Sequence, residues 1–219
     1  MSSSTTAANS LKALQTTIVL AGAGKMGNAL LSGWLAQGLD GKRVAVIEPH
    51  PSDEITALVA KGVRLNPSPK DVGAVATLVI ALKPQSFREA GAMLKSFTGP
   101  STLVVSIMAG ATIASISEVC GGSVVRAMPN TPAAIGRGIT VAVAAGDVSN
   151  SQRAIADALL RATGSVEWVD DENLMDAVTA VSGSGPAYIF LLAEELARAG
   201  VEAGLPQDLA TFNKRFGTG

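Results

Sequence analysis

The chain has 219 residues, of which 47% are hydrophobic and 16% are charged, and its formal net charge is −1. This length and composition suffice for a buried core in one or two domains, whereas the near-neutral charge argues against nucleic acid or a membrane surface as partner. The single cysteine, Cys120, excludes an internal disulfide and a thiolate metal cluster and suits a reducing cytoplasm. The only histidine, His50, excludes a histidine-rich metal site.

Short apolar runs alternate with amphipathic segments between residues 16 and 170. The expected strands are Thr17–Ala21, Val44–Glu48, Val63–Leu65, Thr77–Leu82, Thr102–Ile107, Val124–Met128, Ile139–Ala144 and Val166–Val169. The expected helices are Asn28–Gln37, Asp53–Lys61, Phe87–Lys95, Thr112–Val119 and Ser151–Ala162. Because strands that alternate with helices form parallel sheets covered on both faces, the fold class is α/β, with a Rossmann-type doubly wound sheet.

The two ends of the chain differ from this pattern. Residues 1–15 are rich in Ser, Thr and Ala and lack the layout of a signal peptide, so we expect a disordered leader. A first domain with this α/β pattern is expected over residues 16–170. Residues 171–219 contain the helical patterns Glu172–Val181 and Pro186–Ala203 and no further strand, which predicts a mostly helical second domain. No apolar run is long enough to span a membrane.

A glycine-rich loop, Gly22-Ala23-Gly24-Lys25-Met26-Gly27, follows the first strand and opens a helix. In this context Gly22 permits a tight turn, Gly24 lets the backbone approach a pyrophosphate, and Gly27 lets the helix pack on the strand. The free N–H groups of the first helical turn then face the phosphates. No Gly-Lys-Ser/Thr closes the loop, so it is not a Walker A loop. The competing interpretation is an ordinary strand–helix turn.

Glu48 ends the second strand about twenty residues after the loop, where dinucleotide-binding proteins carry the acid that binds the ribose. An acid there favours the free 2′-hydroxyl of NAD and repels the 2′-phosphate of NADP. His50 and Ser52 are close enough in sequence to hold a phosphate, although His50 fits equally well as an exposed turn residue. The choice between NAD and NADP stays open at this point.

Four segments follow the loop in a distinctive order: Ala81-Leu82-Lys83-Pro84-Gln85, Ser106-Ile107-Met108-Ala109-Gly110, Arg126-Ala127-Met128-Pro129-Asn130-Thr131-Pro132 and Val181-Ser182-Gly183-Ser184-Gly185-Pro186-Ala187-Tyr188. The first three stand at expected strand ends, where ligands of open α/β sheets bind. Together these segments resemble the pyrroline-5-carboxylate reductase family, over about residues 16 to 210.

The resemblance implies reduction of the C=N bond of 1-pyrroline-5-carboxylate to L-proline by hydride transfer, the last step of proline biosynthesis, with NADP as cofactor and NAD as a second option. It also implies a homo-oligomer. The dinucleotide-binding domain is then residues 16–170, and the resemblance implies that residues 171–219 are a truncated, all-helical domain for substrate binding and dimerisation. The implied cofactor residues are Ala21, Gly22, Ala23, Gly24, Lys25, Met26, Gly27, Glu48, Ala81, Leu82, Lys83, Pro84, Ile107, Met108 and Ala109. The implied substrate-side residues are Asn130, Ser182, Gly183, Ser184, Gly185 and Pro186. Hydride transfer to an imine needs positioning rather than a nucleophile or a metal.

Several of these residues also have ordinary structural interpretations. Lys83 fits a solvated charge at a strand end, and Asn130 fits a turn before Thr-Pro. The run Ser182–Gly185 fits a flexible connector between helices. Cys120 precedes two glycines at a helix end and is expected to be inert, and the apolar segment Ile189–Leu191 fits core or subunit contact.

The end of the chain departs from the family. Gly204–Ala210 has the form of a helix start, but Thr211–Gly219 has no apolar periodicity and holds two of the five phenylalanines, so no helix is expected to develop there. The later helices and the Ser/Thr-Pro-Gly-Gly-Thr-type loop of the family are missing. These features predict a truncated or frame-shifted member, with cofactor binding intact, turnover impaired, the oligomer interface incomplete, and an exposed, aggregation-prone face on Pro186–Ala203.

Two alternatives follow from these departures. The chain fits a catalytically impaired fragment that binds only the dinucleotide. It also fits another Rossmann oxidoreductase of the β-hydroxyacid dehydrogenase type, which normally uses a lysine on its helical domain. No lysine occurs between Lys95 and Lys214, and this absence counts against the second alternative.

Overall fold

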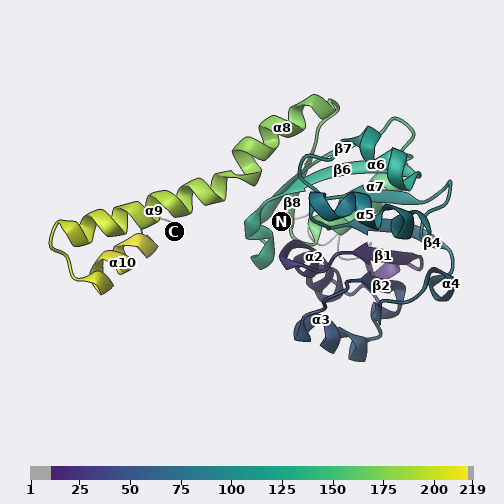
Figure 1. Cartoon of the computed structure of the whole chain (residues 1–219), viewed down its shortest axis with the longest axis horizontal. Coiled ribbons are helices and arrows are strands. Elements are labelled where there is room, and N and C mark those ends of the chain that lie inside the picture. Colours follow the sequence, from purple (N-terminus) through teal and green to yellow (C-terminus); the bar gives the residue numbers. More distant parts are fainter. Residues whose placement is uncertain (1–10, 217–219) are drawn as a thin grey trace.

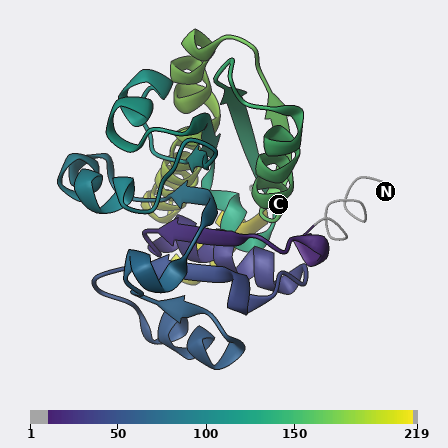
Figure 2. The same cartoon turned by 90° about the vertical axis from the view of Figure 1, so that its right-hand side faces the viewer.

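The computed structural model describes residues 11–216, with side chains as far as Thr211. Eight strands form one sheet in the order β3-β2-β1-β4-β5-β6-β7-β8, with helices on both faces (Figures 1 and 2). The strands are β1 Thr17–Ala21, β2 Val44–Ile47, β3 Arg64–Leu65, β4 Val75–Ile80, β5 Leu103–Ser106, β6 Ser123–Pro129, β7 Gly138–Ala144 and β8 Gly164–Trp168. The predicted doubly wound sheet is therefore confirmed.

The helices alternate with these strands and then form a separate run at the end of the chain. In the sheet region they are α2 Lys25–Ala36, α3 Asp53–Ala57, α4 Pro69–Val72, α5 Pro84–Lys95, α6 Ile113–Cys120 and α7 Asn150–Arg161, with short 3-10 helices η1 Gly41–Arg43, η2 Leu58–Lys61 and η3 Thr131–Ile135. The final run comprises the 3-10 helix η4 Glu172–Leu174, α8 Met175–Val178, the π-helix η5 Thr179–Gly183, α9 Gly185–Glu202 and α10 Gln207–Phe216. We call this run, from Glu172 onward, the arm.

The first six strands in the sheet order, from β3 through β2, β1, β4 and β5 to β6, run parallel to one another. The direction then changes once. β7 pairs antiparallel with β6, and β8 pairs parallel with β7. The carboxyl ends of β1, β4 and β5 consequently lie side by side at one edge of the sheet, because these strands are parallel neighbours. The glycine loop and two of the four family segments start at this edge.

The central strands, such as β1 and β5, are buried on both faces, which explains why they are continuously apolar, whereas the edge strands β3 and β8 are partly exposed. Ile18 and Leu20 of β1 face a core formed with α2 and α7, whereas Val19 and Ala21 face a second core formed with α5 and α6. Trp34 of α2 is fully buried in the first core, and its indole N–H donates to the carbonyl of Leu159 at 2.8 Å. This bond ties α2, the helix that the glycine loop opens, to α7.

Two helices begin three residues earlier than the apolar pattern predicted. α2 begins at Lys25 rather than Asn28, and α5 begins at Pro84 rather than Phe87. The first turn of α5 is Pro-Gln-Ser, which gives no apolar periodicity although Pro is well suited to a first turn. The predicted helix Glu172–Val181 is divided into 3-10, α and π segments.

Two predictions about the ends of the chain were wrong. Leu11 is fully buried in the first core and residues 11–13 are helical, so the leader predicted to extend to residue 15 is too long; residues 1–10 lie outside the described residues. The expected absence of a helix after Ala210 is contradicted by α10. Gly204, at φ +99°, turns the chain, and Ala210 is buried where it lies close to Gly200 of α9. Sequence periodicity missed α10 because this helix packs back on α9 after the turn at Gly204, and local patterns do not contain such a contact.

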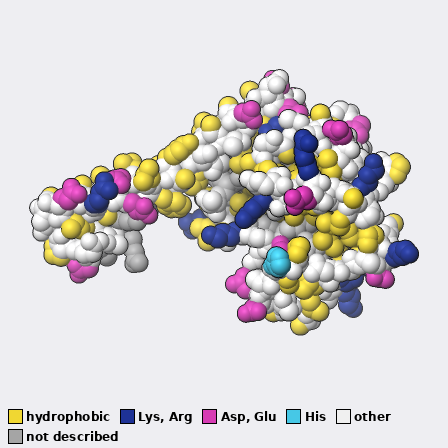
Figure 3. Space-filling view, viewed as in Figure 1, with side chains coloured by type: hydrophobic (Ala, Val, Ile, Leu, Met, Phe, Trp, Pro, Cys, Tyr) yellow, Lys and Arg dark blue, Asp and Glu magenta, His cyan; other side chains and the backbone are white. Residues whose placement is uncertain are grey.

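The arm projects from the sheet domain (Figure 1), and α9 carries many exposed apolar side chains, coloured yellow in Figure 3. The most exposed large apolar side chains of the arm are Val181 of η5 and, on α9, Tyr188, Ile189, Phe190, Leu191, Leu192 and Leu196. Ala193 is the buried residue of α9. Along the described part of the chain no helix is both long and apolar enough to cross a membrane.

Replacing Trp34 by Ala should lower the free energy of unfolding by about 3–5 kcal/mol, because the change leaves a large cavity and an unpaired carbonyl in the core. Urea unfolding followed by circular dichroism measures this difference. Trp168→Ala is the matched control, since Trp168 is only partly buried and Arg153 lies over its ring at 4.3 Å. An equal loss in both variants would contradict the larger contribution to stability expected from the buried Trp34.

Candidate dinucleotide and substrate site

The first and third glycines of the loop are required by the protein itself. Gly22 has φ +91°, and a Cβ there would lie 2.7 Å from the carbonyl oxygen of Ala81. A Cβ on Gly27 would lie 2.2 Å from the carbonyl oxygen of Gly22. Both distances are shorter than any real contact, so these two glycines allow β1, β4 and α2 to meet.

Gly24 differs from both neighbours in the motif. A Cβ at this position would meet no described atom within 4 Å, and its backbone is extended, so neither packing nor conformation requires glycine. The open space is where a ligand would approach the backbone. Gly24 is also the N-cap of α2 and provides no side-chain cap, and the first turn contains no acidic residue, which leaves its N–H groups available to an anion. The loop therefore fits a dinucleotide pyrophosphate.

Glu48 lies directly against this loop. Its carboxylate accepts the N–H of Ala23 at 2.9 Å and that of His50 at 3.1 Å. The expectation that Glu48 lies beside the glycine loop is therefore correct. A contact of Glu48 with the ribose stays a prediction. His50 is exposed, as its place in a turn indicated (cyan in Figure 3).

Asn66 holds Glu48 in place, and sequence reasoning missed it. The Asn66 side chain accepts the N–H of Glu48 and donates to its carbonyl, both at 2.8 Å. Asn66 has φ +49°, a left-handed conformation that asparagine tolerates better than most residues. An asparagine directly after the short strand Arg64–Leu65 was the available signal.

The predicted cofactor residues at the ends of β4 and β5 lie next to the loop. The Ala81 N–H donates to the Ala21 carbonyl at 2.8 Å, and the Ile107 N–H donates to the Ile80 carbonyl at 3.0 Å. The side chains of Ile107 and Met108 are buried in the two cores, so a ligand at this edge would meet backbone rather than these side chains. Ala109 and Lys83 are exposed.

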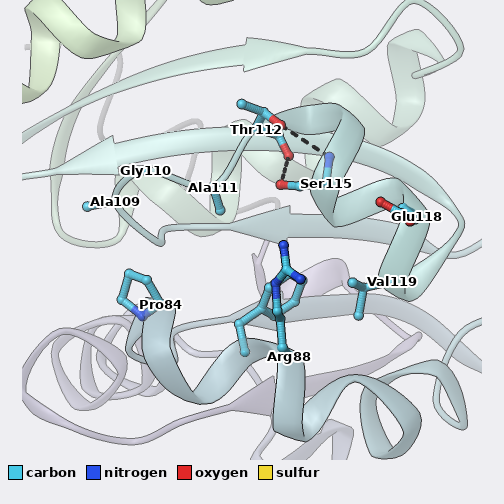
Figure 4. A pocket seen from close by; sticks show the side chains of 10 residues that line it. Pro84, Arg88, Ala109, Gly110, Ala111, Thr112, Ser115, Glu118 and Val119 are labelled. Atoms are coloured by element: carbon cyan, nitrogen blue, oxygen red, sulfur yellow. Dashed lines mark hydrogen bonds between the residues drawn. The ribbon is translucent and has the colours of Figure 1, made fainter.

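A pocket of about 620 Å³ opens beside these strand ends, between α5 and α6 (Figure 4). Pro84 and Ala109 form part of its lining, together with Arg88, Thr112 and Ser115. The Arg88 guanidinium points into the pocket. Sequence reasoning missed this pocket because its polar residues come from two helices and form no motif.

Asn130 follows the end of β6 and has a structural bond. Its side-chain oxygen accepts the N–H of Ile139 at 2.9 Å, which ties the end of β6 to the start of β7. The turn interpretation of Asn130 is therefore correct in part. In the described residues its amide nitrogen has no hydrogen-bond partner and remains able to donate to a ligand.

The predicted substrate turn spans the π-helix η5 and the start of α9. A Cβ on Gly183 would lie 2.5 Å from the terminal methyl of Met128, so this turn rests on the end of β6. The Ser182 hydroxyl oxygen is buried and finds no hydrogen-bond partner among the described residues. Single-turn π-helices occur frequently at functional sites, and a buried polar atom without a partner calls for an explanation. The turn is thus an ordered element rather than a flexible connector.

Cys120 is buried at the end of α6, and burial raises the pKa of its thiol to about 11. The thiol is therefore neutral at physiological pH and unsuited to nucleophilic attack. Its expected inertness agrees with this environment.

The fold and the glycine loop define a dinucleotide-binding oxidoreductase of Rossmann type. Two family models match the chain: one described as NADP oxidoreductase, coenzyme F420-dependent, over residues 17–110, and one described as pyrroline-5-carboxylate reductase dimerisation, over residues 172–212. The second match covers most of the arm and runs into α10.

Individual relatives agree with these matches. The pyrroline-5-carboxylate reductase of Pseudomonas aeruginosa is 38% identical over 199 residues, which are 89% of this chain and 72% of the relative. That of a Synechocystis species is 40% identical over 194 residues, 86% of this chain and 71% of the relative. The chain belongs to the pyrroline-5-carboxylate reductase family.

Solved structures of the family have the same fold. The reductase of Coxiella burnetii superposes with a TM-score of 0.79 at 30% identity, covering 94% of this chain and 77% of that one. The Plasmodium falciparum enzyme, solved with NADP bound, superposes with a TM-score of 0.78 at 26% identity, covering 93% and 76%.

Gly24→Val should abolish dinucleotide binding without lowering stability, because its side chain would occupy the open space without touching the protein. Gly27→Ala should instead cost about 1–3 kcal/mol of stability, because its methyl group would collide with a backbone carbonyl. Fluorescence titration with NADPH and thermal unfolding separate the two effects. Unchanged affinity in Gly24→Val would show that the pyrophosphate binds elsewhere.

Proposed function

We propose that this chain reduces the C=N bond of 1-pyrroline-5-carboxylate to L-proline, the last step of proline biosynthesis. The observation that carries this proposal is the open position at Gly24, in a loop of a chain that belongs to the family named for this reaction. Its single, neutral cysteine is compatible with a reducing compartment, and we place the activity in the cytoplasm.

NADPH is the proposed hydride donor, with NADH as a second option. A family model described as an NADP oxidoreductase matches residues 17–110, and the Plasmodium falciparum enzyme was solved with NADP. Against this, the Glu48 carboxylate lies within hydrogen-bond distance of the loop and disfavours a nearby phosphate. Comparing the two cofactors is therefore part of the test below.

The residues of the chain bind and orient the reactants. When bound, the reduced nicotinamide supplies the hydride. The N–H groups at the start of α2 hold the pyrophosphate, and the backbone of Ala81–Pro84 and Ile107–Ala109 lines the ribose and nicotinamide side. The free amide nitrogen of Asn130 donates a hydrogen bond at the nicotinamide end.

The turn Ser182–Gly185, with Pro186 in the first turn of α9, binds the substrate. The hydroxyl of Ser182, which has no partner among the described residues, suits the carboxylate of a small imino acid. Orientation of this kind can supply a large part of the rate acceleration for a hydride transfer. A covalent intermediate is not required, which fits the buried, neutral Cys120.

The test pairs binding with turnover. Titration with NADPH and with NADH by fluorescence measures cofactor affinity, and oxidation of each is then followed in the presence of pyrroline-5-carboxylate. Ser182→Ala should lower kcat/KM by about 10- to 100-fold, the range for loss of one strong hydrogen bond, while NADPH affinity stays unchanged.

Gly24→Val is the control that should lose both binding and turnover. Cofactor binding without turnover in the parent chain would favour the impaired fragment that only binds dinucleotide. Failure to bind either cofactor would refute the proposal. The β-hydroxyacid dehydrogenase alternative lacks its lysine and has no further support.

We also propose that two copies of the chain associate through the arm. The family model for dimerisation matches residues 172–212, and the side chains of Tyr188, Leu192 and Leu196 are between 57% and 63% exposed along one stripe of α9. A stripe of this kind on an isolated chain is typical of an interaction surface.

Leu192→Glu should convert the dimer to a monomer, because a carboxylate would be buried without a partner in the contact. Size-exclusion chromatography with light scattering measures the mass. Val59→Glu is the matched control, since Val59 is an exposed apolar residue on the sheet domain. An unchanged mass in the Leu192 variant would place the interface elsewhere.

A further inference from the structure

Arg126 is a buried cation that the proposed reaction does not use directly. It lies on β6, opposite Ser106 of β5, and only 4% of its surface is exposed. Because a guanidinium stays charged at all relevant pH values, a buried arginine requires a carboxylate partner. Because β6 holds Arg126 in the sheet, the partner carboxylate must lie beside this position of β6.

The partner is Glu172, the first residue of the arm. Its carboxylate lies 3.0 Å from the Arg126 guanidinium, and its side chain is 31% exposed. A second carboxylate, Asp176, lies at 3.5 Å but is 92% exposed. An ion pair with so exposed a residue contributes little, so Glu172 is the effective partner.

The same carboxylate oxygen of Glu172 also accepts the N–H of Ile113 at 2.7 Å. Ile113 is the first residue of α6, where the helix dipole favours a negative charge. The connection between β5 and α6 carries Ile107–Ala109, the segment proposed for the nicotinamide side. Glu172 therefore joins the arm to β6 and to the end of this connection.

Met128 lies two residues beyond Arg126 on the same face of β6, since side chains alternate along a strand. Its terminal methyl meets Gly183 of the substrate turn. The arm thus follows β6 from Arg126 to Met128, and Ser182–Gly185 lies next to the end of this strand. A rotation at Glu172 would move the turn away from the cofactor edge.

We infer that Arg126, acting through Glu172, is a positioning residue that sets the substrate turn Ser182–Gly185 relative to the nicotinamide-side segment Ile107–Ala109. This inference rests on the proposed function for its catalytic consequence. Its structural content, the fixed direction of the arm, can be measured without any activity.

The direction of the arm is measured by spin-label distances. Cysteines at Glu89 of α5 and Ala199 of α9 carry the labels, both positions being exposed, while Cys120 stays unlabelled because it is buried and its thiol is neutral. Labelled chain is diluted with unlabelled chain so that distances within one copy are read. Glu172→Gln should broaden or shift the distance distribution, and Asp176→Asn should change it least.

Kinetics provide the second readout. Glu172→Gln and Arg126→Met should raise KM for pyrroline-5-carboxylate and lower kcat/KM by about 100-fold, the effect of misplacing a reactant by about 1 Å, with NADPH affinity unchanged. Arg126→Lys keeps the charge and should restore part of the loss. A purely structural role would lower the active fraction, and hence kcat, without raising this KM.

The outcomes separate the inference from the proposed function. Parental distances and parental KM in Glu172→Gln would overturn the inference. If the parent chain has no reductase activity, the distance distribution alone decides, and the proposed function fails separately. Should Arg126→Met not fold, the double variant Arg126→Met with Glu172→Met removes both charges and keeps the comparison available.

Discussion

Two close approaches between backbone segments hold the nucleotide-binding edge together. The carbonyl of Ala81 occupies the place of a side chain on Gly22, and the carbonyl of Gly22 occupies that of Gly27. Through these contacts the backbones of β1, β4 and α2 come closer together than a side chain on either glycine would allow. Everything proposed for cofactor binding depends on this arrangement, because it fixes the start of α2 at the edge where β1, β4 and β5 end.

The fold could be predicted because its central strands are buried on both faces. Continuous apolar runs such as Leu103–Ser106 have few alternatives in a chain where helical patterns separate them. The residues at which helices and strands begin and end were harder to predict. Packing through a turn, as at Gly204, and burial of one residue, as at Leu11, arise from tertiary contacts that local patterns do not contain.

The parts of the site that follow from local sequence were predicted, and the parts that depend on distant partners were not. The glycine loop and Glu48 were found by spacing, and the structure joins them through the Ala23 N–H. The roles of Asn66 and Arg126 were missed because each depends on a partner distant in the sequence: the Asn66 side chain on Glu48, and the Arg126 guanidinium on Glu172. The side-chain oxygen of Asn130 is used by the fold, through the N–H of Ile139, and a contact of its amide nitrogen with a ligand stays a proposal.

The buried hydroxyl of Ser182 has a consequence for discrimination between ligands. A buried polar atom without a partner destabilises the free protein by about 1–3 kcal/mol, and a ligand that supplies the missing partner recovers this energy. Under the proposed function, a cyclic imine without a carboxylate would leave the hydroxyl unsatisfied. Sites of this kind reject analogues lacking the polar group far more strongly than apolar pockets reject an extra methylene. Under the proposed function, selection against plain cyclic imines is therefore already present in the chain before any ligand binds.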